Sequence, residues 1–335
     1  VFEYTIQADE TDSHGISILG DTLALNGSTI KDAALNDAIL THSAESDNSS
    51  YIVDTTPPTV SSVAITSGTG MLNDFLNHPT DVVSATVTFS ELVNITGTPQ
   101  LTLAVGSDNR TATYASGTGS APLVFQYTIQ AGDNDTNGIS IGANALALNN
   151  GTISDPAGNN ATLTHSAVSD NNSYKVDTTA PTVDNFTLSD TALKAGDNAT
   201  VSLVFSEAVF GFASAADITA DNGTLSTMTS DNNDNETWRG TFTPTPNTED
   251  DNNTLSLANS YTDLAGNAGT AETTANYAID TLLPTISSVT AGWGTFLNAT
   301  EDNSSGTVTV LTSGAENDQT VTVALNGTNY TGTVS

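Results

Sequence analysis

The chain has 335 residues and a formal net charge of −33, from 38 Asp and Glu residues against 5 Lys and Arg residues. Nucleic acids and anionic membrane surfaces need clustered basic side chains, so this charge excludes both as partners, and the sequence has no apolar run of the about 18 residues that would cross a membrane. Cysteine is absent, which excludes disulfides, thiol catalysis and cysteine-based metal sites.

The chain starts within an internal repeat. Residues 2–60 align without a gap with residues 125–183, and 38 of the 59 aligned positions are identical. A repeat of this quality means that one folding unit recurs. Residues 1–53 correspond to the second half of a 123-residue unit, so we expect the chain to be a segment of a longer polypeptide.

An Asp-Thr-x-x-Pro motif ends each repeat, at residues 54–58, 177–181 and 280–284. Proline fixes its own backbone and extends the preceding residue, so each motif predicts a short, stiff linker. The motifs divide the chain into the second half of a repeat (1–54), a complete repeat (55–177), a shorter repeat (178–280) and the first half of a further repeat (281–335).

Within the repeats, apolar and polar residues alternate in short runs, which is the period of half-buried strands. Examples are residues 101–105, 125–129, 201–205, 308–310 and 321–325. Asn-Gly pairs and clusters of Gly, Asp and Asn separate the runs, as in hairpin turns. The pattern predicts an all-β fold of tandem antiparallel β-sandwiches, with at most one helical turn at residues 72–76 and at 213–218.

Several motifs together resemble the bacterial immunoglobulin-like (Ig-like) repeats of giant surface adhesins of the RTX and biofilm-associated types. They are Phe-Ser-Glu at 89–91, Gly-Thr-Pro-Gln-Leu-Thr-Leu at 97–103, Tyr-Thr-Ile-Gln-Ala-Gly-Asp at 127–133, Asp-Pro-Ala-Gly-Asn at 155–159 and the linker motif. Residues 182–280 resemble a shorter repeat of the same proteins, and the tail resembles the start of a third variety. The resemblance implies an extracellular or cell-surface location and Ig-like sandwiches.

An Asp-rich segment at 133–138 is the first candidate metal site. Asp133, Asp135 and Asn137 place oxygen ligands at alternate positions before a glycine, as in a calcium loop. The preceding repeat keeps Glu10 and Asp12 at the first two of these positions but has a histidine at the third. The alternative interpretation is a hairpin turn rich in Asp and Asn.

The repeat junctions form the second candidate. In the resembling adhesins, calcium sits between successive repeats, which implies that the linker acids pair with the glutamate of Phe-Ser-Glu in the next unit. The acids concerned are Asp54, Asp177, Asp280, Glu91 and Glu207. The alternative is that each Asp caps its linker turn and each Glu is a solvated strand end. The Asp-x-Ala-Gly-Asn segments at 155–159 and 263–267 are predicted to be turns.

Catalysis has no support in the sequence. The four histidines are isolated, and no nucleophile elbow, zinc-protease motif or phosphate-binding loop occurs. Trp238 and Trp293 are predicted to be core residues, with stacking on sugars as the alternative. Asn-x-Ser/Thr sequons are frequent and would accept N-glycans if the source glycosylates surface proteins.

We therefore expect a non-enzymatic structural extender of a large extracellular adhesin or cell-surface fibre, stiffened by Ca²⁺, whose partners are the neighbouring repeats. One alternative is a self-assembling filament or surface-layer subunit, in which half-domains of different copies complete one another. A second alternative is a carbohydrate-binding accessory module, for which the aromatic content of 6% is low.

Overall fold

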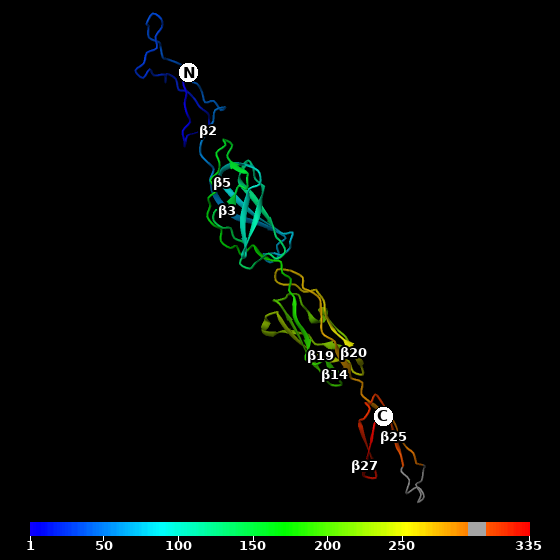
Figure 1. Ribbon diagram of the computed structural model, residues 1–335. Coiled ribbons are helices and arrows are strands. Elements are labelled where there is room, and N and C mark those ends of the chain that lie inside the picture. Colours follow the sequence, from blue (N-terminus) through cyan, green and yellow to red (C-terminus); the bar gives the residue numbers. More distant parts are fainter. Residues whose placement is uncertain (294–305) are drawn as a thin grey trace. The chain divides into compact units, whose positions relative to one another are not determined.

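The computed structural model describes residues 1–293 and 306–335 and is nearly all β-structure (Figure 1). It divides into two compact units, Val1–Thr179 and Ala180–Ser335. Within the described residues, the helical segments are one four-residue α-helix, α1 (Ser214–Asp217), and one 3₁₀ turn, η1 (Asp231–Asn233). No helix in these ranges has the length and apolarity that crossing a membrane requires.

The first 54 residues contain little regular structure. Two short strands, β1 (Thr11–Asp12) and β2 (Val53–Asp54), pair antiparallel, and isolated bridges such as Ile18 with Glu45 hold the rest. Large apolar side chains remain exposed along this segment, among them Phe2, Tyr4 and Leu19. Residues 1–54 contribute no side chain to either of the two apolar clusters found in the described chain.

The complete repeat that follows forms two sheets. The large sheet has the order β10-β6-β7-β8-β5-β11, and β3 also pairs with β5, along residues other than those that pair with β11. The small sheet has the order β4-β12-β9. The strands are β3 (Val60–Thr69), β4 (Phe75–Leu76), β5 (Val82–Thr96), β6 (Gln100–Val105), β7 (Asp108–Ser116), β8 (Ser120–Thr128), β9 (Asn134–Asp135), β10 (Leu146–Ala147), β11 (Thr152–Ser154) and β12 (Lys175–Asp177).

Alternation along the strands fills the core of this repeat. In β6, Leu101, Leu103 and Val105 are buried while the residues between them are partly exposed, because successive side chains of a strand point to opposite faces. Phe125 of β8 and Leu76 of β4 are fully buried in the same apolar cluster. This cluster draws all its members from residues 60–176.

The second unit contains an equivalent sandwich with its own apolar cluster, whose members lie between residues 183 and 279. Its largest sheet has the order β13-β15-β19-β17 with β18 also on β19, and two smaller sheets are β14-β23-β20 and β16-β21-β22. The strands are β13 (Val183–Leu188), β14 (Ala192–Lys194), β15 (Ala199–Phe205), β16 (Ile218–Ala220), β17 (Gly223–Leu225), β18 (Thr229–Ser230), β19 (Thr237–Pro244), β20 (Glu249–Asn253), β21 (Leu255–Leu257), β22 (Glu272–Thr273) and β23 (Tyr277–Asp280).

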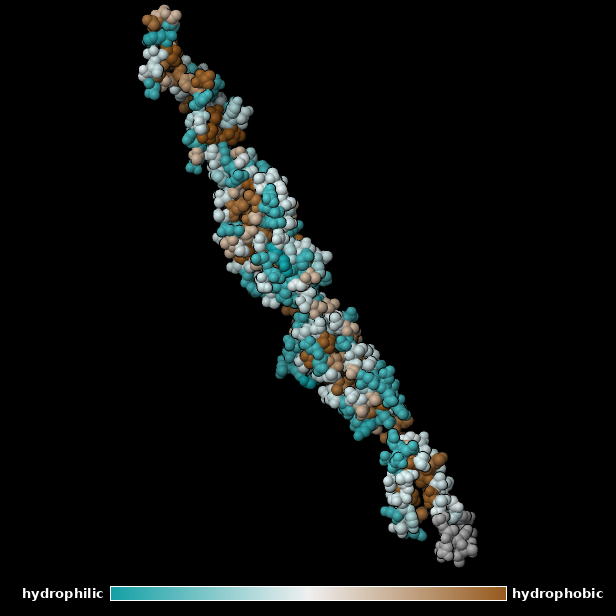
Figure 2. Space-filling model, in the orientation of Figure 1, coloured by the Kyte–Doolittle hydropathy of each residue, from teal (hydrophilic) through white to brown (hydrophobic). Residues whose placement is uncertain are grey.

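The last segment forms two separate hairpin-like sheets. Strands β24 (Thr285–Ala291) and β25 (Val308–Ser313) pair antiparallel, as do β26 (Thr320–Leu325) and β27 (Thr328–Thr333). Ile286, Val289 and Leu311 are more than half exposed. The strands of this segment thus leave large apolar side chains exposed (Figure 2).

Two local expectations need correction. Residues 72–76 form a tight turn leading into β4 and not a helical turn, whereas the helical turn expected at 213–218 is present as α1. The sheets are also not purely antiparallel, because β12 pairs parallel with β4 and β23 pairs parallel with β14. In both repeats the parallel partner is a short strand in the connection that follows the first strand of the repeat.

Candidate cation-binding site

Three acidic side chains converge where residues 1–54 meet the complete repeat. Asp54, Glu91 and Asp155 each offer a carboxylate oxygen, and these oxygens lie within 4.8 Å of one another. Asp155 is buried, while Asp54 and Glu91 are half-buried. The structure thus brings together two of the residues expected at a junction, Asp54 and Glu91, and adds a third acid.

Hydrogen bonds fix the backbone around this cluster. Asp54 ends β2, and the linker after it is held to β5 by two bonds between Thr59 and Ser90: the Ser90 N–H donates to the Thr59 carbonyl at 2.8 Å, and the Thr59 N–H donates to the Ser90 hydroxyl at 3.0 Å. Glu91 follows Ser90 directly in β5. The Phe-Ser-Glu motif therefore uses its serine to anchor the linker and its glutamate to meet the linker acid.

The Asp-Pro-Ala-Gly-Asn turn supplies the third carboxylate. Strand β11 pairs with β5, with Ser154 opposite Asn94, and this brings the next residue, Asp155, close to Glu91. The Asn159 N–H donates to Asp155 Oδ1 at 2.8 Å, and Asn159 Nδ2 donates to Asp155 Oδ2 at 2.7 Å and to the Asp54 carbonyl at 3.0 Å. The predicted turn is present, and it also ties Asp54 to the repeat.

The electrostatics of the cluster are unfavourable without a counter-charge. Burial raises the pKa of Glu91 above its ordinary value, and the negative charges of Asp54 and Asp155 raise it further. Two like charges about 4 Å apart repel by about 1 kcal/mol in bulk water and by about 4 kcal/mol at an effective dielectric constant of about 20. A bound cation would remove this repulsion, and carboxylate oxygens are the ligands that hard divalent cations prefer.

Sequence equivalents exist in the later repeats. In the second unit, Glu207 follows a serine that exchanges the same two bonds with Thr182, at 2.9 and 3.0 Å. The Asp263 carboxylate accepts from the Asn267 N–H at 2.9 Å and from Asn267 Nδ2 at 2.8 Å, as Asp155 does with Asn159. Asp177, the linker acid equivalent to Asp54, ends β12 in the first unit.

Asp280 is placed like the other two linker acids, but the next repeat has no glutamate at the position of Glu91. It ends β23 and accepts from the Leu282 N–H at 3.2 Å. In the next repeat, Ile286 pairs with Thr312 as Val60 pairs with Phe89. The position of Glu91 is therefore taken by Gly314, and the last repeat lacks the glutamate of the cluster.

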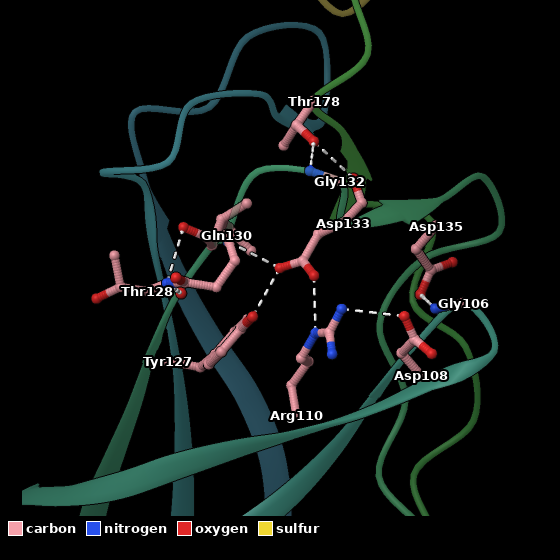
Figure 3. A network of polar contacts seen from close by, with 11 residues as sticks. Gly106, Asp108, Arg110, Tyr127, Thr128, Gln130, Gly132, Asp133, Asp135 and Thr178 are labelled. Atoms are coloured by element: carbon pink, nitrogen blue, oxygen red, sulfur yellow. Dashed lines mark hydrogen bonds and ion pairs between the residues drawn. The ribbon is translucent and has the colours of Figure 1, made fainter.

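In the Asp-rich segment, Asp133 is surrounded by protein donors (Figure 3). Its Oδ1 accepts from Arg110 Nε at 2.7 Å, and its Oδ2 accepts from the Tyr127 hydroxyl at 2.7 Å and the Gln130 N–H at 2.8 Å. Asp133 is 1% exposed. Burial is the main cause that raises the pKa of Tyr127, and its bond to Asp133 raises it further. Arg110 already supplies a positive charge to this carboxylate.

Asp135 and Asn137 are also held by protein groups. Asp135 is buried and accepts from the Gly106 N–H at 2.7 Å and the Gly138 N–H at 2.8 Å. Asn137 Nδ2 donates to Asp170 at 2.5 Å. These contacts give the segment the bonding of a turn, which was the alternative interpretation of the same residues.

The first copy of this segment repeats part of the pattern. Glu10 accepts from the Tyr4 hydroxyl and, at 2.7 Å, from the Gln7 N–H, and the Tyr4 bond is the main cause that lowers the pKa of Glu10. Asp12 accepts from the Gly15 N–H at 3.0 Å, as Asp135 does from Gly138. Glu10 is partly exposed, whereas Asp133 is buried.

Asp155 is the site residue that the sequence did not assign. The available signal was the recurrence of Asp-x-Ala-Gly-Asn at 155–159 and 263–267, once per repeat, which we interpreted as a turn. The interpretation of the backbone was right, but only the fold shows that this turn lies beside the Phe-Ser-Glu strand. The alternation of apolar and polar residues along one strand does not show which strand pairs with it, or which turn follows that neighbouring strand.

One part of the chain matches a known protein family. Residues 177–279 match the sequence model of the bacterial Ig-like domain. Among solved structures, the chain is similar to FdeC, an Escherichia coli adhesin, with 14% identity and a TM-score of 0.23 over 70% of this chain and 66% of that chain. No curated protein matches the chain. The described residues form an all-β protein of Ig-like sandwiches, and residues 177–279 are similar to the bacterial Ig-like domain.

Proposed function

We propose that this chain is a non-enzymatic structural segment of an extracellular bacterial surface protein, in which calcium at the repeat junction limits bending. The observation that carries the proposal is the convergence of Asp54, Glu91 and Asp155. Asp54 ends one repeat, and the other two acids belong to the next. A cation bound by all three would join the repeats through their own backbone-anchored side chains.

Each residue has a separate part in this mechanism. Ser90 and Asn159 hold the linker backbone in place, so Asp54 keeps its position beside the two other acids. Proline at positions 57 and 58 restricts the linker further. The cation supplies the positive charge that lets three carboxylates remain ionised and close together.

The donor set and the composition favour calcium over other metals. The cluster offers only oxygen ligands, and calcium accepts six to eight of them in flexible geometry, whereas magnesium demands a near-ideal octahedron. Extracellular calcium modules bind with Kd of about 10⁻⁴–10⁻³ M. The net charge of −33 also makes cation binding favourable in general.

The carbohydrate-binding alternative has less support. Trp238 is half-buried, packs edge-on against Phe212 with ring centroids 4.9 Å apart, and donates from Nε1 to the Asn235 carbonyl at 3.2 Å. These contacts fit a residue at the border of the core. A sugar-stacking platform needs an open aromatic face.

Thermal unfolding with and without calcium tests the proposal. At 10 mM calcium, which is about 10 to 100 times the expected Kd, binding would stabilise the first unit by about 1.4–2.7 kcal/mol relative to EDTA. Glu91→Gln should abolish most of this gain, because it removes one ligand charge while leaving the Ser90 and Asn159 contacts intact. Magnesium at the same concentration should stabilise less.

Glu249→Gln is the matched control, since Glu249 is an exposed glutamate of β20 outside the cluster. It changes the net charge equally and should leave the calcium response unchanged. An equal calcium response in the two variants would mean that the charge acts as a diffuse solvation surface, and the proposed site would be wrong. The same conclusion follows if calcium changes nothing in the parent chain.

A further inference from the structure

A threonine directly follows the linker acid in each Asp-Thr-x-x-Pro motif, at Thr55, Thr178 and Thr281. Thr55 and Thr178 are half-buried, and Thr281 is buried. A hydroxyl that is taken from water needs a hydrogen-bond partner. The contacts of these three hydroxyls therefore show what the motif does besides supplying an acid.

In the complete repeat, the partner is the loop that leads from β8 to β9 (Figure 3). The Thr178 hydroxyl donates to the Asp133 carbonyl at 3.0 Å and accepts from the Gly132 N–H at 2.9 Å. The Asp133 carboxylate is buried and accepts from three protein donors. The loop is thus fixed to the body of the repeat, and Thr178 fixes the linker to the loop.

The first linker makes the same contact. Thr55 Oγ1 donates to the Glu10 carbonyl at 3.1 Å, and Glu10 is the repeat equivalent of Asp133. The Glu10 carboxylate also accepts from a tyrosine hydroxyl and a backbone N–H, as that of Asp133 does. The contact is therefore a property of the repeat and not of one loop.

The third linker keeps the contact although its loop has a different sequence. Thr281 Oγ1 donates to the Thr245 carbonyl at 2.7 Å and accepts from the Thr248 N–H at 2.9 Å. The loops at residues 130–133 and 245–248 occupy the same place, because each leads into the strand that pairs antiparallel with the last strand of its repeat. The threonine is common to both repeats, whereas the loop residues are not.

Each threonine lies just beyond the sheet. In all three repeats the linker acid is the last residue of its strand that pairs antiparallel with a neighbouring strand. The pairs are Asp54 with Thr11, Asp177 with Asn134 and Asp280 with Glu249. The hydroxyl of the next residue therefore continues the attachment of the linker after the backbone pairing has ended.

The backbone that the threonine holds also orients the linker acid. In each linker, one carboxylate oxygen of the acid accepts from the backbone N–H two residues further on. The three bonds are Asp54 Oδ1 with the Thr56 N–H at 3.0 Å, Asp177 Oδ1 with the Thr179 N–H at 3.0 Å, and Asp280 Oδ1 with the Leu282 N–H at 3.2 Å. Because Thr55 joins Asp54 to Thr56, holding Thr55 in place also holds the N–H that orients the Asp54 carboxylate.

We propose that the linker threonine is a positioning residue for the cation site. Its hydroxyl fixes the linker to the preceding loop and thereby holds the carboxylate of the linker acid in the orientation that a cation needs. The effect on calcium rests on the proposed function, whereas the anchoring of the linker needs no cation. Groups that orient metal ligands without touching the metal contribute about 10–100-fold to metal affinity.

Amide hydrogen exchange of the full chain in EDTA, followed by NMR, tests the anchoring. Thr178→Val keeps the shape of the side chain but removes the acceptor of the Gly132 N–H. The Gly132 amide should then exchange roughly tenfold faster, as expected for the loss of one hydrogen bond. Thr178→Ser keeps the hydroxyl and should restore the parent rate. Thr136→Val is the matched control, since Thr136 is an exposed threonine of the turn after β9.

Thermal unfolding over a series of calcium concentrations tests the positioning. Thr55→Val should raise the calcium concentration that gives half of the maximal stabilisation by about tenfold. Thr55→Ser should return this midpoint to the parent value, because the hydroxyl is restored. Thr56→Val is the matched control: Thr56 is exposed, and its backbone N–H contact with Asp54 remains.

The outcomes separate this inference from the proposed function. Equal calcium midpoints in Thr55→Val, Thr55→Ser and the parent chain would overturn the positioning role, while the cation site would stand. Unchanged exchange of the Gly132 amide in Thr178→Val would overturn the anchoring, with or without calcium. If calcium does not stabilise the parent chain, the proposed site is wrong and the positioning role falls with it, and the exchange of Gly132 still decides the anchoring.

Discussion

Arg110 donates from Nε to Oδ1 of Asp133 at 2.7 Å, and this ion pair links β7 to the loop that follows β8. The Asp133 side chain is fully buried, while that of Arg110 is 30% exposed. A buried carboxylate needs a counter-charge or several donors, and Asp133 has both (Figure 3).

Arg110→Ala should therefore destabilise the first unit by about 2–3 kcal/mol, because it leaves a buried charge with neutral donors only. Urea denaturation monitored by circular dichroism would measure the loss. Arg239→Ala is the control: Arg239 pairs with Asp231, both side chains are more than one-third exposed, and its loss should cost less than about 1 kcal/mol. Equal losses of stability in the two variants would show that the Arg110–Asp133 pair contributes no more than the exposed pair.

Phe125 and Phe2 occupy the same repeat position but differ in burial. Phe125→Ala should cost about 3–5 kcal/mol, since it removes a fully buried aromatic side chain. Phe2→Ala should change the stability of the chain by less than about 0.5 kcal/mol, because Phe2 is 87% exposed. Comparable losses of stability in the two variants would mean that Phe2 is buried in solution, against its exposure in the structure.

Gly138 adopts a φ of +97°, and a Cβ atom there would lie 2.0 Å from the Asn171 carbonyl oxygen. Gly138→Ala should thus cost more than the about 1–2 kcal/mol of a left-handed alanine alone. Gly132 has a φ of +89° but open space around the added carbon, so Gly132→Ala should show only that backbone cost. Denaturant midpoints of the two variants would separate the steric clash from the backbone strain.

Burial raises the pKa of Tyr127, Tyr261 and Tyr277. A tyrosine whose pKa is higher in the folded state adds stability that is fully present below its unfolded pKa of about 10 and is lost as the pH rises above that value. We therefore expect the free energy of unfolding to fall steeply above a pH of about 10. Tyr261→Phe should weaken this pH dependence in the second unit. Denaturant titrations between neutral and alkaline pH would detect the change. If the unfolding free energy kept the same dependence on pH, Tyr261 would not contribute to it.

Local chemistry in the sequence determined the strands and turns. Alternation in runs such as residues 101–105 and 201–205 predicted strands, because side chains of a half-buried strand alternate between core and solvent. The identity of residues 2–60 and 125–183 predicted that one fold recurs. The family match at residues 177–279 agrees with the predicted Ig-like class.

Only the tertiary structure decided which acids meet and which apolar strands are covered. Asp54, Glu91 and Asp155 are far apart in sequence and converge because β11 pairs with β5 and the linker is bonded to Ser90. Phe2 and Phe125 have nearly the same neighbours in sequence, yet one is exposed and the other buried. Burial depends on the partner strands that surround a residue, and a local pattern does not contain those strands.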